Sequence, residues 1–134
     1  MGSERLQAAF PEGRVALVPY LTAGYPTLDG AYEVGEAYVE AGADVVEIGV
    51  PFSDSLADGP VIQNTNTRAL DNGANLRYCL RLASHFVDRV PVVFLTSYNI
   101  VFARGAERFL DEATDAGVWG LVIPVLPVGA GLDF

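Results

Sequence analysis

The chain alternates short apolar runs with amphipathic stretches, and this alternation constrains the fold more than any other feature. Runs that are apolar along their whole length, and bounded by Gly or Pro, are typical of parallel strands buried on both faces by crossover helices. We therefore predict an α/β protein with four parallel strands. The expected strands are Val15 to Tyr20, Asp44 to Val50, Pro91 to Ser97 and Gly120 to Val125.

Between these runs, apolar residues recur at the spacing of a helix face. Gly42 and Gly117 each follow a predicted helix and precede a strand, where a glycine with positive φ commonly ends the helix. Residues 41–48 and 116–123 match in pattern, as a repeated helix-glycine-strand unit would, although αβ turns in general look alike. A closed barrel and a flavodoxin-like open sheet share this alternation, so periodicity leaves both open. The stripes are Val34, Ala37, Tyr38 and Ala41; Leu76, Cys79, Leu80, Ala83 and Val87; and Ala106, Phe109, Leu110 and Ala113.

Length and composition predict a single domain over residues 1–134, since 51% of its residues are hydrophobic. Met1, Gly2 and Ser3 resemble a cloning remnant, so residues 1–4 are given no structural weight, and residues 126–134 are expected to form a mobile tail. The net charge of -9 disfavours binding to nucleic acid or to an anionic membrane face.

Nothing in the sequence predicts secretion or membrane insertion. The one cysteine, Cys79, cannot form an internal disulfide, and no charged start followed by an apolar run marks a signal peptide. No apolar run approaches the roughly 20 residues that span a bilayer. We expect a cytoplasmic protein.

Glu47 is the first candidate for chemistry, because it stands inside an apolar strand. Burial disfavours the charged form of a carboxylate and raises its pKa, so such a residue is costly unless it is paired or used. It lies near the carboxyl end of a strand, where α/β folds gather reactive groups. Glu47 is thus a candidate general acid/base, or a carboxylate satisfied by a nearby backbone amide. Asp58, in the following loop, could turn back toward it, although an Asp before Gly is usually a turn former.

Absences narrow the mechanism. The chain has no lysine, so it cannot itself form a Schiff base with a carbonyl substrate. His85, the only histidine, is expected at a surface or at a helix end, and Cys79 in the core. Acid/base work falls to carboxylates or tyrosines, and no cofactor is predicted, because no glycine-rich dinucleotide or phosphate-binding motif follows a strand. As an alternative, Glu47, Asp54 and Asp58 could bind a hard cation such as Mg²⁺.

Three segments together resemble the tryptophan synthase α subunit family: residues 18–26 (VPYLTAGYP), 47–54 (EIGVPFSD) and 56–63 (LADGPVIQ). Tyr98-Asn99, a turn at residues 102–105 and the strand at 120–124 extend the resemblance over nearly the whole chain. It implies the N-terminal half of a TIM (β/α)8 barrel. It also implies a lyase of tryptophan biosynthesis, which splits indole-3-glycerol phosphate into indole and glyceraldehyde 3-phosphate by a cofactor-free retro-aldol reaction.

The resemblance assigns roles to individual residues. Glu47 matches the carboxylate that shuttles protons between the substrate hydroxyl and indole C3, and Asp58 matches the one that stabilises the protonated indolenine through its ring N–H. The expected substrate-binding residues are Tyr20, Thr22, Leu95 and Ser97.

The chain also departs from the family pattern. Ser55 replaces a proline in the loop that contacts the β subunit, which puts that partnership in doubt. Ser97 replaces a pocket tyrosine and would enlarge or rewet the indole site. Val125 replaces an aspartate, and Trp119 and Ile100 are unusual.

A half-barrel would leave its first and last strands unpaired, so we expect a homodimer that closes an eight-stranded barrel. In that view Trp119 and Val125 are adaptations to the interface. Phosphate in such barrels is held by loops after strands seven and eight, which this chain would lack. The alternative to a lyase is therefore an inactive, self-associating half-barrel scaffold, and the sequence does not choose between the two.

Overall fold

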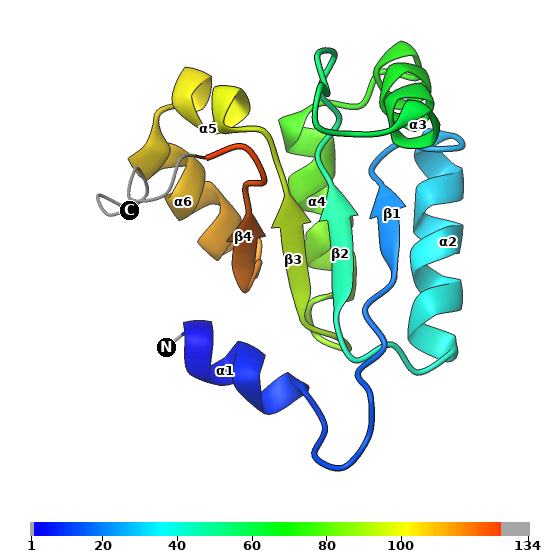
Figure 1. The fold of residues 1–134 in the computed structure, drawn as a ribbon, viewed down its shortest axis with the longest axis vertical. Helices are drawn as coiled ribbons and strands as arrows, with labels where there is room; N and C mark the ends of the chain where they lie inside the picture. Colours follow the sequence, from blue (N-terminus) through cyan, green and yellow to red (C-terminus); the bar gives the residue numbers. More distant parts are fainter. Residues whose placement is uncertain (1, 127–134) are drawn as a thin grey trace.

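The computed structural model describes residues 2–126. Its centre is a four-stranded parallel sheet in the order β1-β2-β3-β4, so each strand pairs with its neighbour in the chain (Figure 1). The predicted α/β fold with four parallel strands is confirmed. The strands are β1 (Tyr20–Thr22), β2 (Val46–Gly49), β3 (Val92–Leu95) and β4 (Gly120–Val122), and the helices are α1 (Gly2–Ala9), α2 (Leu28–Glu40), α3 (Pro60–Asp71), α4 (Leu76–Phe86), α5 (Tyr98–Arg104) and α6 (Ala106–Asp115).

Helices α2, α4 and α6 cover one face of the sheet, whereas α3 and α5 lie at the carboxyl ends of the strands (Figure 1). Leu21, Ile48 and Phe94 stand in one row across three strands, and each is buried. Helix α4 adds the fully buried Phe86 and Cys79 to the same core, so the prediction for Cys79 is confirmed.

Local signals explain where the helices begin and how closely they pack. The Thr27 side chain accepts a hydrogen bond from the Gly30 amide at 2.8 Å and so caps α2, an arrangement that stabilises a helix by about 1 kcal/mol. Gly35 lies inside α2, where a glycine costs about 1 kcal/mol relative to alanine. A Cβ there would stand 2.6 Å from Cε2 of Phe86, so the glycine allows this ring to pack against α2.

The first strand is later and shorter than expected. We expected Val15 to Tyr20, but β1 covers Tyr20–Thr22, and Val15 is 90% exposed. Pro19 accepts a hydrogen bond from the Glu47 amide at 3.0 Å but has no N–H with which to continue a ladder.

Helices α3 and α5 were not predicted. Helix α3 buries Thr65, Asn66 and Ala69, so it has no apolar stripe to detect. Helix α5 occupies the segment in which only a turn was expected, and it ends at Gly105 with φ of 89°. By contrast, Gly42 and Gly117 do take positive φ, both 86°, as predicted.

The segment that was given no weight is helical. Helix α1 lies below β4, at the amino ends of the strands, and its Arg5 guanidinium stacks 4.4 Å from the centre of the Trp119 ring (Figure 1). Residues 2–4, to which no structural weight was given, thus form the start of α1. Residues 127–134 of the expected tail lie outside the described residues, and within the described part no helix is long and apolar enough to cross a membrane.

Candidate active site

Four of the six predicted site residues share the face of the sheet turned away from α2, α4 and α6. Strand register places Tyr20 beside Glu47, and one step further Thr22 stands beside Gly49 and Gly49 beside Leu95. Because side chains two residues apart point to the same face of a strand, Tyr20, Thr22, Glu47 and Leu95 all lie on this inner face.

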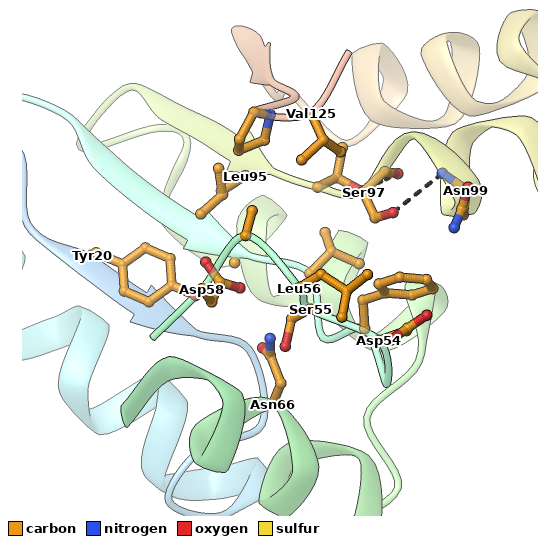
Figure 2. Close-up of a pocket in the computed structure, with 16 residues that line it drawn as sticks. Tyr20, Asp54, Ser55, Leu56, Asp58, Asn66, Leu95, Ser97, Asn99 and Val125 are labelled. Atoms are coloured by element: carbon orange, nitrogen blue, oxygen red, sulfur yellow. Dashed lines mark hydrogen bonds between the residues drawn. The ribbon is translucent and has the colours of Figure 1, made fainter. Parts of the chain in front are cut away.

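A pocket of about 250 Å³ opens above the inner face, at the carboxyl ends of the strands (Figure 2). Of the six predicted site residues, Asp58, Tyr20, Leu95 and Ser97 line this pocket, whereas Glu47 and Thr22 do not belong to its lining. Tyr20 and Asp58 stand on one side of the pocket, opposite Ser97 and Asn99 (Figure 2). The other lining residues are Gly49, Val50, Phe52, Asp54, Ser55, Leu56, Ala57, Asn66, Thr96, Pro124 and Val125.

The loop that carries Asp58 is tied down by Gln63 of α3. The Gln63 side-chain amide donates to the carbonyl of Asp58 at 2.8 Å and to that of Ser55 at 3.3 Å. The Asp58 amide itself donates to the Ser55 carbonyl at 3.1 Å. Asp58 is thus held by its backbone one residue before Gly59 and Pro60 begin α3, and its carboxylate is left to face the pocket.

The two candidate carboxylates act on the same phenol. Burial raises the pKa of Tyr20 above its ordinary value, and the negative charges of Asp58 and Glu47 raise it further. Glu47 stands beside Tyr20 in the strand register, and Asp58 lines the same pocket as Tyr20, so both carboxylates neighbour this residue.

Glu47 has the properties of a proton carrier. Burial raises the pKa of its carboxyl above the ordinary value, which favours the protonated form. Its carboxylate makes no hydrogen bond to any of residues 2–126, so the alternative of a Glu satisfied by a backbone amide is not supported. The group is therefore left free to exchange a proton with a ligand on the inner face.

Ser97 and Asn66 add polar groups to the lining of the pocket. Ser97 caps α5 by accepting a hydrogen bond from the Asn99 amide at 3.2 Å, a role that the sequence did not indicate (Figure 2). Asn66 was missed. It is 5% exposed and lines the pocket, and its side chain makes no hydrogen bond within the described chain. The only signal in the sequence was that a helix following the Asp58 loop would place Asn66 near that loop. No helix was predicted there, so the signal could not be used.

The remaining candidates lie outside this site. His85, in the last turn of α4, pairs with Glu36 at 2.7 Å, which confirms its predicted place at a helix end. Among the described residues no three His, Cys, Asp or Glu side chains are grouped to hold a metal ion, and this does not support the Mg²⁺ alternative for Glu47, Asp54 and Asp58.

A parallel β/α sheet with a pocket over the carboxyl ends of its strands defines one half of a protein of the β/α-barrel class. The sequence is specific enough to name the family within this class. Residues 6–134 match the tryptophan synthase alpha chain family, and this chain belongs to it.

Relatives of known sequence and structure agree. The chain is 44% identical to the tryptophan synthase alpha chain of Caldanaerobacter subterraneus subsp. tengcongensis over 119 residues, which are 87% of this chain and 45% of that one. It is 46% identical to the alpha chain of Prochlorococcus marinus over 128 residues, 94% of this chain and 46% of that one. The chain thus spans about half the length of these relatives.

Solved structures show the same partial coverage. Tryptophan synthase from Mycobacterium tuberculosis, in an aminoacrylate-bound form, superposes with a TM-score of 0.91 at 32% identity, over 96% of this chain and 55% of that one. The alpha subunit from Legionella pneumophila superposes with a TM-score of 0.83 at 33% identity, over 94% and 48%. The fold is accordingly half of a TIM barrel.

Proposed function

We propose that this chain carries the acid/base machinery of an indole-3-glycerol-phosphate lyase. The observation that supports the proposal most is that Glu47 stands beside Tyr20 in the sheet while Asp58 lines the same pocket as Tyr20, at the end of the sheet where barrel enzymes place their active sites. The site residues in this proposal are Glu47, Asp58, Tyr20, Thr22, Leu95 and Ser97.

The chemistry needs one proton to move from the substrate hydroxyl to C3 of the indole ring. Protonation at C3 turns the ring into an electron-accepting indoleninium ion, and Asp58 stabilises this cation by accepting a hydrogen bond from the ring N–H. Glu47 removes the hydroxyl proton. The deprotonated oxygen then forms the aldehyde carbonyl as the C–C bond to indole C3 breaks. The electron pair of that bond passes to the ring and restores neutral indole.

A raised pKa suits Glu47 to this work, because a carboxyl group that holds its proton nearer to neutral pH can both give and take one. The apolar wall near Leu95 suits a flat aromatic ligand. The pocket volume of about 250 Å³ is modest, which suits a small ligand.

The test is release of indole from indole-3-glycerol phosphate. It is measured for the chain alone and for the chain mixed with the C-terminal half of a relative's alpha chain. Glu47→Gln and Asp58→Asn should each lower the rate by about 10²- to 10⁴-fold. Asp54→Asn is the matched control, because Asp54 lines the same pocket but has no part in the proposed chemistry. Equal rates for the Glu47→Gln variant and the unaltered chain would remove Glu47 from the mechanism.

Self-association is the second candidate function. Strands β1 and β4 stand at the two margins of the sheet, and Val122 on β4 and Val125 beyond it are 44% and 61% exposed. We propose a homodimer in which the two margins meet and close a barrel. The Trp119 ring does not require a second copy of the chain to cover it, since Arg5 of the same chain already stacks on it.

The dimer is tested by light-scattering chromatography, because a monomer has a mass of 14.3 kDa and the dimer twice that. Val122→Glu should convert the dimer to monomer, whereas Val61→Glu, at a 74% exposed site on α3, should not. A monomeric unaltered chain would sink the closed dimer. Repeating the indole-release assay with a β subunit present tests whether the chain binds that partner, which Ser55 puts in doubt. The cytoplasmic location stays a prediction.

A further inference from the structure

Three side-chain hydroxyls form a hydrogen-bonded chain from the pocket wall to helix α3. The Tyr20 hydroxyl lies 3.1 Å from Oγ1 of Thr22, and that oxygen lies 2.8 Å from Oγ1 of Thr65. Thr65 in turn lies 2.8 Å from the carbonyl oxygen of Ile62. Thr22 and Thr65 are both buried, with 4% and 8% of their surfaces exposed.

The last link determines the direction of the whole chain. A carbonyl oxygen only accepts, so Thr65 donates its single hydroxyl proton to Ile62. Thr65 can then only accept from Thr22, which must donate to it. Thr22 has no second proton, so Tyr20 must be the donor to Thr22.

The phenol proton of Tyr20 is therefore turned away from any ligand. Tyr20 lines the pocket, and a Cβ at Gly49, another lining residue, would stand 2.7 Å from Cζ of the Tyr20 ring. The phenol end of Tyr20 thus lies over Gly49, and all that its oxygen can offer to a ligand is a lone pair. Glu47 and Asp58 are the charged groups that act on this phenol.

We propose that Thr65 is a positioning residue, which holds Tyr20 as a hydrogen-bond acceptor and so makes the pocket selective for ligands that present an N–H or O–H donor there. Its importance for catalysis rests on the lyase function proposed above. The direction of the hydroxyl chain does not, and it can be read in a protein without activity.

The first test compares Thr65→Val with Thr65→Ser by titrating the Tyr20 phenol. The probe is ¹⁹F NMR of chain labelled with 3-fluorotyrosine, whose more acidic phenol titrates before alkaline unfolding, and Tyr20→Phe assigns the signal. In Thr65→Val, Thr22 loses its acceptor and rotates to donate to the phenol oxygen, which stabilises the phenolate. The pKa of residue 20 should fall by about one pH unit. Thr65→Ser keeps the hydroxyl and should restore the original value.

An unchanged pKa in Thr65→Val, or the same fall in Thr65→Ser, would overturn the proposal. Thr22→Val gives an independent reading. It removes the acceptor of the neutral phenol and should lower the pKa of residue 20, whereas it would raise this pKa if Thr22 were the donor.

Ligand selectivity is the second test, with indole and benzothiophene, which lacks the N–H, as probes in an Asp58→Ala background, where the ring N–H has no carboxylate to bind. Thr65→Val should reduce the preference for indole by about tenfold, and Thr65→Ser should not. If Thr65→Val shifts the pKa as expected but leaves the preference for indole unchanged, Thr65 orients the Tyr20 phenol without affecting ligand choice. That result would overturn the proposed selectivity. No indole release from the unaltered chain, with the pKa and the preference both changed as expected, would instead count against the lyase function alone.

Discussion

The phenol end of Tyr20, on the first strand, lies over the α-carbon of Gly49 on the second, in the space that any larger residue at position 49 would fill. Gly49→Ala would place its Cβ 2.7 Å from Cζ of the ring. The ring must then move and lose its hydrogen bond to Thr22, and crowding of this kind typically costs about 1–3 kcal/mol. Urea unfolding measures this cost. In a Tyr20→Ala background, Gly49→Ala should cost almost nothing, because the ring that the new methyl group would meet is gone. If the losses of the two single variants simply add in the double variant, the methyl group does not meet the Tyr20 ring.

Glu47 should make the unfolding free energy fall as the pH rises. Burial raises its pKa in the folded chain above the ordinary value of 4.5, so the folded state binds more protons than the unfolded one. The stabilisation is full below that ordinary value and is lost as the pH climbs through the raised one. Glutamine does not titrate, so the Glu47→Gln variant should not lose this stabilisation. The unfolding free energy of the variant, relative to that of the unaltered chain, should therefore rise between pH 4.5 and neutrality. Glu12→Gln, at an exposed loop position, should show no such trend.

Glu36 should have the opposite pH dependence. The Arg89 guanidinium and then His85 hydrogen-bond its carboxylate, each at 2.7 Å, and lower its pKa from 4.5 to about 2. The resulting stabilisation is fully present above pH 4.5 and is lost as the pH falls toward 2. Glu36→Gln should therefore be less stable than the unaltered chain at neutral pH, with the deficit shrinking over that window. Glu33→Gln, exposed on the same helix, is the control, and a deficit that does not change with pH would exclude the ion pairs as its cause.

Trp119 should report the docking of helix α1 by its fluorescence, because it is the only tryptophan in the chain. Its ring carries the Arg5 guanidinium at 4.4 Å. Arg5→Ala removes a contact of about 0.5–1 kcal/mol and should change the Trp119 emission. Arg81→Ala, at an exposed site on α4, should leave it unchanged. Emission unaffected by Arg5→Ala would mean that α1 does not rest on this ring in solution.

Cys79 should be unreactive until the chain unfolds. It is fully buried, and burial raises the pKa of its thiol to about 12, so almost no thiolate is present at neutral pH. Its reaction with a thiol reagent should be slower by ~10³ or more than that of a cysteine at the exposed Thr67 position in a Cys79→Ala background. Comparable rates would indicate frequent local opening of α4.

The sequence predicted the elements whose buried apolar residues form a run or a stripe, and it missed α3 and α5, whose buried apolar residues, Ala69 and Val101, form neither. Strands β2, β3 and β4 and helices α2, α4 and α6 were found, because Ile48, Phe94 and Phe109 belong to runs or stripes whose only use is burial. Helix α3 turns Thr65 and Asn66 inward, so no apolar period marks it.

The site divides in the same way. A glutamate inside an apolar strand was a visible anomaly, and its raised pKa agrees with that prediction. The roles of Gln63 and Thr65 were not visible, because each depends on where α3 returns over the sheet. The exclusion of Glu47 from the pocket lining was equally hidden, because the strand pattern does not show that the lining on β2 begins only at Gly49.

The contact between α1 and β4 also has a consequence for synthesis of the chain. Each new strand pairs with the one made just before it, so the sheet can grow from β1 onward as the polypeptide leaves the ribosome. Helix α1 is the exception. It emerges before the strands, but the surface of Trp119 and Gly120 on which it packs does not exist until the fourth strand has formed. A segment translated before all four strands is therefore among the last to reach its final contacts.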